Sequence, residues 1–312
     1  MKRLNTILAV IEPKREHQEA LSRAIALCGM NPEIQVTALR VVYDFSSDIN
    51  FVHELSSNDA KKSIMDAHQT QLQELVNGYV KDSGAKVEAK VCFCKDIAQG
   101  ILNEAQSKPY DLLIKGANSH GILDSILFTP IDWELLRRAD CPVIIAKNEG
   151  WVEHAPIVVA LDFTSNQKKL TNLLILREAQ MFARATNGII HLVNSAPIML
   201  PTVMLEIPHY APETYAQQVV QEHKKRLLEF ASHHHIPKEN CHVENGMPDD
   251  VIPDLCKKLN AKTVFIGSAG RTGAMAALVG NTCEEIVDYI DADLFVINYK
   301  AAKKRTEKEP IK

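Results

Sequence analysis

The sequence lacks several features that mark common classes of protein. No apolar run approaches the ~18 to 20 residues that a membrane-spanning helix requires, and the apolar segment 7–11 is too short for a secretory signal. A surplus of basic residues is also missing, because the net charge is −4 and a nucleic-acid surface needs a concentrated basic stripe. The seven cysteines are irregularly spaced and do not form a disulfide framework. These absences favour a cytoplasmic protein that binds neither membranes nor nucleic acid directly.

Motifs for common phosphate and acyl chemistry are missing as well. No Gly-x4-Gly-Lys-Ser/Thr sequence occurs, which excludes the usual P-loop mechanism. No histidine stands at a fixed spacing from Ser268 that would indicate a nucleophile and its base. The histidines at 233–235 point in different directions at a helix end and suit a solvated terminus better than a zinc site. We therefore expect no catalytic residues and no dedicated metal site.

The two halves of the chain repeat one another. Apolar runs of the first half recur in the second at a nearly constant offset of about 150 residues. The matched runs are 7–11 with 157–161, 111–114 with 263–266, and 141–145 with 292–296. This offset is far longer than the period of a solenoid, so it predicts domain duplication.

The repeat divides the chain into domains. We expect a first domain at 1–147, a linker at 148–156, a second domain at 157–300 and a disordered tail at 301–312. With 46% hydrophobic and 24% charged residues, the composition allows each domain a core of normal size.

Short apolar runs alternate with amphipathic stretches in each half. In the second half the pattern predicts strands and helices in alternation. The strands are expected at 157–161, 189–193, 242–243, 263–266 and 294–297, and the helices at 166–185, 212–233, 248–259 and 283–290. Strands separated by helices form parallel sheets with helices on both faces. The predicted fold class is therefore α/β, with two tandem, doubly wound, five-stranded parallel-sheet domains of strand order 3-2-1-4-5.

A glycine-rich loop follows the fourth strand of the second half, with the spacing Gly-x2-Gly-x9-Gly. Glycines can adopt positive φ and bring backbone N–H groups close to a ligand. The helix start after the last glycine offers further N–H groups and the positive end of its dipole to an anion. The donors predicted around phosphate are Gly267, Ser268, Gly270, Arg271, Gly280, Asn281 and Thr282. The alternative is a tight turn that lets the helix pack on the sheet.

Asp162 follows the first strand of the same half. The ends of the first and fourth strands are neighbours in this topology, so Asp162 can face a ligand held by the glycine loop. Its carboxylate suits a ribose hydroxyl or a bound metal. The alternative role is an N-terminal cap for the helix after residues 164–166.

The glycine loop together with the strand-end Asp162 resembles the universal stress protein family, and the resemblance covers both halves. It implies that the loop holds the phosphates of ATP, alone or with Mg²⁺, that Asp162 lies near the ribose, and that Leu192 or Val193 meets adenine. It also implies a sensor or adaptor role in stress tolerance, including resistance to DNA-damaging agents. The family has Ser or Thr directly after the last glycine, where this sequence has Asn281.

The resemblance also implies that the final strands, 143–146 and 294–297, pair about a pseudo-twofold axis within one chain; a homodimer is a further possibility. The first half has lost its nucleotide loop. Its matching segment begins with Lys115 opposite Gly267, and only Gly121 survives in register. Phe128 replaces the last glycine, Pro130 replaces Thr282, and Glu12 replaces Asp162. We predict that this half does not bind ATP in the family's manner.

Long apolar connections at 43–57 and 196–207 suit packing against the partner domain or a pocket for a hydrophobic ligand. The alternative function is accordingly a weak nucleotide hydrolase or a small-molecule transferase with a hydrophobic pocket.

Overall fold

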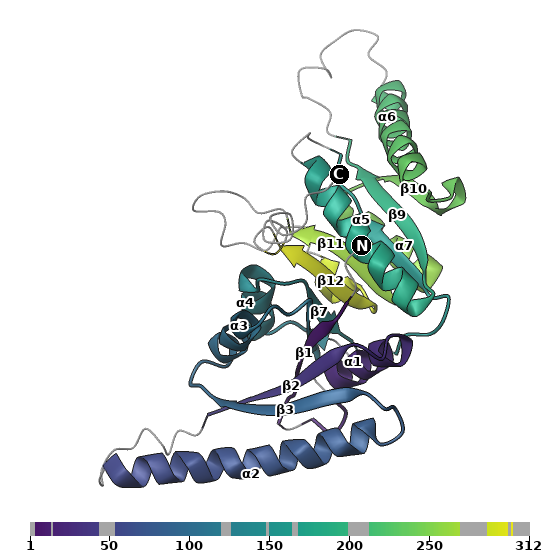
Figure 1. The fold of residues 1–312 in the computed structure, drawn as a ribbon. Helices are drawn as coiled ribbons and strands as arrows, with labels where there is room; N and C mark the ends of the chain where they lie inside the picture. Colours follow the sequence, from purple (N-terminus) through teal and green to yellow (C-terminus); the bar gives the residue numbers. More distant parts are fainter. Residues whose placement is uncertain are drawn as a thin grey trace. The chain divides into compact units, whose positions relative to one another are not determined.

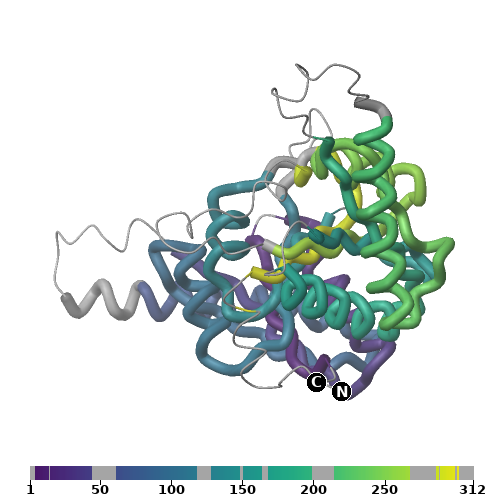
Figure 2. Tube along the Cα trace, turned by 90° about the horizontal axis from the view of Figure 1, so that it is seen from above, coloured from purple at the N-terminus to yellow at the C-terminus, as the bar shows by residue number. Residues whose placement is uncertain are grey.

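The computed structural model describes residues 4–13, 15–43, 54–119, 126–147, 150–163, 168–198, 212–268, 286–298 and 301 (Figure 1). Two compact units divide the chain. Unit 1 comprises Met1–Gly150 and Phe295–Lys312, and unit 2 comprises Trp151–Leu294. Figure 2 follows this division along the chain, with unit 1 beginning in purple and blue and unit 2 in teal and green.

Unit 1 is an α/β unit with a parallel sheet. Its main elements are β1 (Thr6–Val10), α1 (Glu19–Met30), β2 (Gln35–Val42), α2 (Glu54–Val80), β3 (Lys86–Phe93), α3 (Ile97–Ser107), β4 (Leu112–Gly116), α4 (Pro130–Arg138) and β7 (Val143–Ala146). The strands lie in the order β7-β4-β1-β2-β3, and each neighbouring pair is parallel. This is the predicted order 3-2-1-4-5, which is confirmed. A short antiparallel pair, β5 (Asn118–Ser119) with β6 (Ile126–Leu127), was not predicted.

Helices cover both faces of the sheet in unit 1. On one face, Leu21 of α1 and Leu72 of α2 pack in a cluster with Val42 of β2. On the other face, Gly100 of α3 comes so close to Val41 that an added Cβ would lie 2.8 Å from Val41 Cγ1. Because neighbouring residues of a strand point to opposite faces, these contacts place α1 and α2 opposite α3. Strands buried on both sides explain the nearly continuous apolar runs.

Unit 2 repeats this architecture. Its elements are β8 (Pro156–Ala160), α5 (Lys168–Thr186), β9 (Ile189–Ala196), α6 (Pro212–His233), β10 (Cys241–Asn245), α7 (Pro248–Leu259) and β11 (Thr263–Ser268), with short 3-10 turns at Lys238–Asn240 and Val287–Tyr289. The order β10-β9-β8-β11 continues to β12 (Asp293–Asn298), whose Asp293 N–H donates to Lys262 O at 3.0 Å. The order 3-2-1-4-5 is confirmed here too, as are the bounds of α6 and α7.

The segments on either side of unit 2 are anchored in different ways. Trp151, inside the predicted linker, packs edge-on against Phe182 of α5 at 4.8 Å between ring centroids, and Phe182 meets Phe265 at 5.5 Å. Asn298, the last residue of β12, belongs to unit 1, and its amide donates to the carbonyls of Leu136 and Ala139 of the same unit at 3.0 and 2.9 Å. Ala301, the first residue of the predicted tail, is buried.

Several predictions fall on residues outside the described part of the chain. These are the rest of the tail, 302–312, and most of the apolar connections, at 44–53 and 199–207. The pairing of the two final strands about a pseudo-twofold axis also stays a prediction.

A histidine pair joins β9 to the edge strand β10. The Nδ1 atom of His191 lies 3.1 Å from Nε2 of His242, and the rings stack at 5.3 Å between centroids. Two nitrogens this close share one proton, so the pair cannot carry a proton on both facing nitrogens. Burial lowers the pKa of both rings.

This pair predicts that acid destabilises unit 2. Because both folded pKa values lie below the unfolded value of about 6.5, the unfolded chain binds more protons as the pH falls past that value. The contribution of this pair to the free energy of unfolding is therefore greatest above about pH 6.5. It decreases as the pH falls towards the lowered folded pKa values. Urea denaturation at a series of pH values, followed by Trp151 fluorescence, measures this slope. The double substitution His191→Gln and His242→Gln is expected to flatten it, and an unchanged slope would contradict the prediction.

Candidate functional site

The structure describes some of the predicted site residues and not others. Asp162, Leu192, Val193 and Gly267 are described, and the backbone of Ser268 ends β11. The remaining predicted residues, Gly270, Arg271, Gly280, Asn281 and Thr282, lie outside the described ranges.

Asp162 and Gly267 are brought to the same edge of the sheet. Strands β8 and β11 are parallel neighbours, with Ile157 opposite Thr263 and Val159 opposite Phe265. Asp162 follows the carboxyl end of β8, and Gly267 lies at the carboxyl end of β11. Ligands of doubly wound sheets bind at this edge.

The structure gives Gly267 a packing role. A Cβ atom at this position would lie 2.5 Å from Cδ1 of Ile175 and 2.8 Å from Cγ2 of Thr171, both on α5. A side chain here would therefore require Ile175 or Thr171 to shift. This close approach is a packing constraint on Gly267, and its predicted contact with phosphate stays a prediction.

Leu192 and Val193 lie inside β9 and not at its end. Both side chains are fully buried, and Val193 O accepts a hydrogen bond from Leu161 N at 2.9 Å. The strand continues to Ala196, past the end predicted at 193. Asn194 is therefore the next residue towards the carboxyl edge, and it is buried although it is polar.

Side-chain amides hold the backbone around Asp162. Asn172 of α5, only 1% exposed, accepts from Asp162 N at 3.1 Å and donates to Asp162 O at 2.9 Å. We call this two-bond contact the amide clamp. On either side, Asn194 donates to Leu161 O at 2.8 Å and Arg226 of α6 donates to Phe163 O at 3.1 Å. The backbone at the strand end is thus fixed before any ligand arrives.

The Asp162 carboxylate itself remains accessible. It is 43% exposed, and Nζ of Lys168, at the start of α5, lies 3.2 Å from its Oδ2. An ion pair this exposed contributes little to stability. The alternative role of Asp162, as an N-terminal cap of the following helix, involves residues 164–167. These residues lie outside the described ranges. A fixed backbone carrying an accessible carboxylate suits recognition of a hydroxyl group.

Unit 1 contains the same amide clamp at the corresponding place. Gln18, 2% exposed, accepts from Glu12 N at 3.0 Å and donates to Glu12 O at 2.9 Å. The amide stands six residues after the acidic residue in unit 1 and ten residues after it in unit 2. Because these spacings differ, matching the halves at a constant offset does not reveal the shared clamp.

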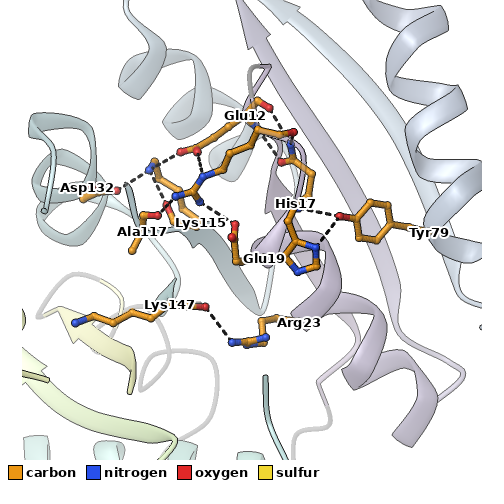
Figure 3. Close-up of polar contacts among 12 residues, drawn as sticks. Glu12, His17, Glu19, Arg23, Tyr79, Lys115, Ala117, Asp132 and Lys147 are labelled. Atoms are coloured by element: carbon orange, nitrogen blue, oxygen red, sulfur yellow. Dashed lines mark hydrogen bonds and ion pairs between the residues drawn. The ribbon is translucent and has the colours of Figure 1, made fainter. Parts of the chain in front are cut away.

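In unit 1 a charged cluster of Glu12, Arg15, Glu19, Lys115 and Asp132 lies at the strand ends. Figure 3 labels Glu12, Glu19, Lys115 and Asp132 of this cluster. Lys115 Nζ lies 2.9 Å from both Glu12 Oε1 and Asp132 Oδ1, and it donates to Gly116 O at 2.9 Å. Lys115 is 3% exposed and Asp132 is 0% exposed. Arg15 pairs with Glu12 at 3.1 Å and with Glu19 at 2.8 Å, and it donates to Ala117 O. Sequence matching did not predict this cluster.

The start of α4 in unit 1 is capped by the protein's own carboxylate. The Asp132 carboxylate accepts from Thr129 N at 2.7 Å, and Thr129 Oγ1 accepts from Asp132 N at 3.4 Å. Pro130 occupies the first turn, and the Phe128 ring packs against Trp133 at 5.1 Å between centroids. A negative group therefore already occupies this helix N-terminus.

Comparison with known proteins now decides the family. The sequence profile described as "Universal stress protein family" matches residues 4–147 and 154–298. The chain belongs to the universal stress protein family. It is 30% identical over 300 residues to universal stress protein E of Escherichia coli K12, covering 95% of each chain. It is 29% identical over 301 residues to universal stress protein E of Photorhabdus laumondii, covering 95% of this chain and 96% of that protein. Membership gives the chain a role in the stress response.

Solved structures show the same fold. A Pseudomonas aeruginosa UCBPP-PA14 protein assigned to the universal stress proteins superposes with a TM-score of 0.71 at 24% identity, covering 98% of this chain and 97% of the other. A universal stress protein from Archaeoglobus fulgidus DSM 4304 superposes with a TM-score of 0.67 at 17% identity, covering 95% of this chain and 99% of the other. Both likenesses concern the fold and cover nearly the whole of this chain.

The strand registers correct one detail of the sequence comparison. Ile7 lies opposite Leu112 in unit 1, and the matching Ile157 lies opposite Thr263 in unit 2. Counting on from these pairs places Gly116, and not Lys115, at the position of Gly267. Gly116 is the last residue of β4, and a Cβ there would require the Arg15 guanidinium to shift. The constant offset misplaced the segment by one residue.

Two further properties concern the described part of this universal stress protein. None of the helices there combines the length and apolar character needed to cross a bilayer. Within the same ranges, no group of three or more His, Cys, Asp or Glu side chains is arranged to hold a metal ion.

Proposed function

We propose that this universal stress protein acts in the cytoplasm and binds ATP in unit 2, as a sensor or adaptor in stress tolerance that includes resistance to DNA-damaging agents. One observation carries the proposal. The amide clamp holds the backbone of Asp162, and the accessible carboxylate of this residue lies at the sheet edge where the glycine loop begins.

The residues around Asp162 fit part of a nucleotide. An accessible carboxylate on a fixed backbone can accept hydrogen bonds from ribose hydroxyls with little loss of conformational entropy. Lys168 brings a positive charge to the same edge, 3.2 Å from Asp162, and this charge suits a phosphate chain. Leu192 and Val193 have buried side chains, so contact with the base falls on later residues of β9.

Unit 1 is proposed to be unable to bind ATP in this manner. Lys115 and Asp132 fill the strand ends and the start of α4 with charges that already neutralise one another. A nucleotide would have to displace this buried ion pair and leave its members unpaired, which is strongly unfavourable. The two domains would then differ in function although they share the amide clamp.

The proposal is tested by nucleotide bound to the purified protein and by calorimetric titration with ATP. Wild-type protein is expected to bind ATP, and Asp162→Ala should weaken binding about ten- to a hundredfold, the worth of one hydrogen bond to a charged group. Glu12→Gln, the matched change in unit 1, should leave the affinity unchanged.

The outcomes separate the proposed binder from other functions. Absence of ATP from the purified protein together with no calorimetric binding would overturn the proposal. Release of ADP above the level of Asp162→Ala would instead support the hydrolase alternative. Equal losses for Glu12→Gln and Asp162→Ala would show that unit 1 also binds nucleotide.

A further inference from the structure

His223 of α6 reaches the carboxyl edge of the sheet in unit 2. Its Nδ1 atom lies 2.6 Å from Oδ1 of Asn194, the buried residue whose Nδ2 donates to Leu161 O at 2.8 Å. The end of β8, the end of β9 and the middle of α6 thus meet at one place. Neither the sequence comparison nor the family resemblance assigns a role to His223.

These two hydrogen bonds determine which nitrogen of the His223 ring carries the proton. Because the Asn194 amide nitrogen donates to Leu161 O, the other amide atom facing His223 is the oxygen, which only accepts. His223 must therefore carry a proton on Nδ1 and donate it to Asn194. In the neutral ring Nε2 is then a hydrogen-bond acceptor, and protonation converts it to a donor while the bond to Asn194 persists.

Three charged groups, on α6 and after β8, act on the His223 ring. Asp162 after β8 and Glu222 on α6 favour the protonated ring, whereas Arg226 on α6 opposes it. Burial is the largest effect and lowers the pKa of His223. The ring is accordingly neutral at neutral pH in the free protein, with a negative carboxylate from the candidate site nearby.

We propose that His223 is a nucleotide-contacting group of the unit 2 site and makes nucleotide affinity rise as the pH falls. A nucleotide brings several negative charges to the edge where His223 and Asp162 interact. These charges stabilise the imidazolium, so nucleotide binding draws a proton onto Nε2. Linkage then requires protonation to strengthen nucleotide binding by the same factor. The inference rests on the proposed function, because it needs nucleotide in unit 2.

The test measures ADP affinity by calorimetry between pH 5.5 and 8 for the full chain and its variants. Wild-type affinity should rise on acidification by up to about tenfold per pH unit, the limit for one linked proton. His223→Gln keeps a side chain that donates to Asn194 but cannot titrate, so it should lose this part of the slope. His233→Gln, a change on the same helix at an exposed ring bonded to Glu229 O, should retain it. Titration of the nucleotide itself is common to all three proteins.

Nitrogen NMR of the histidine rings gives a readout that does not need nucleotide. The free protein should show His223 protonated on Nδ1, and addition of ADP should raise its pKa. An Nε2-protonated tautomer, or a pH slope of affinity that His223→Gln leaves unchanged, would overturn this inference alone. Absence of nucleotide binding at every pH would overturn the proposed function, and this inference with it.

Discussion

Lys115→Met is expected to lower the free energy of unfolding of unit 1 by about 3–5 kcal/mol, the usual cost of removing one member of a buried ion pair. The lysine is 3% exposed and pairs with Asp132, which is fully buried, and with Glu12. Methionine fills a similar volume but leaves the Asp132 carboxylate in the interior without its counter-charge.

The two tryptophans allow each unit to be followed separately. Trp133 lies in unit 1 and Trp151 in unit 2, so urea denaturation in a Trp151→Phe background reports on unit 1. Lys108→Met is the matched control, because Lys108 pairs with Glu88 at 3.3 Å on the surface and exposed pairs contribute only about 0–1 kcal/mol. Equal effects of the two lysine substitutions would contradict the prediction.

A compensated variant tests the physical reason for the loss. Adding Asp132→Asn and Glu12→Gln to Lys115→Met removes the carboxylates that have lost their positive partner. The triple variant should recover much of the lost free energy of unfolding. Buried ion pairs are costly to break but can be replaced as a whole with little loss. No recovery would indicate that packing around Lys115, and not its charge, holds unit 1 together.

Asn172→Leu is expected to destabilise unit 2 and to weaken nucleotide binding together. The substitution removes both hydrogen bonds between the Asn172 amide and the backbone of Asp162, at about 0.5–1.5 kcal/mol for each bond. It also releases the backbone that holds the Asp162 carboxylate, so ATP affinity should fall at least tenfold. Denaturation followed by Trp151, and calorimetry at a temperature where the variant is folded, measure the two effects.

Gln18→Leu is the matched change in unit 1. It breaks the amide clamp on Glu12, together with a third bond at 2.8 Å to Arg15 O, and should destabilise unit 1 by a similar amount. Nucleotide affinity should remain at the wild-type value, because unit 2 is untouched. Loss of affinity in Gln18→Leu, or its retention in Asn172→Leu, would contradict a site built on the clamp around Asp162.

Sequence patterns predicted the architecture well because burial on both faces of a parallel sheet leaves continuous apolar runs. Strand ends were less predictable. β9 continues to Ala196 because Asn194, though polar, satisfies its amide with Leu161 O and His223 and can be buried in the strand. A strand predicted from a run of apolar residues therefore ends before Asn194.

The site was predicted in part. Asp162 was correctly placed at the sheet edge with Gly267, since strand ends of a known order must meet there. The amide clamps were not predicted, because their spacing differs between the halves and a single Asn or Gln in a helix or at its N-cap carries no sequence pattern. The charged cluster was missed for a related reason: Glu12, Lys115 and Asp132 are far apart in sequence and meet only in the fold.

The charged cluster has a thermodynamic consequence for a two-domain binder. A ligand stabilises the domain that binds it by an amount that grows with its concentration, about 2.7 kcal/mol at a hundred times Kd. The pairing of Lys115 with Asp132 is intramolecular, so its effect is the same at every nucleotide level. With ATP bound in unit 2 as proposed, the stability of unit 1 would stay constant, and only the free energy of unfolding of unit 2 would change with nucleotide concentration.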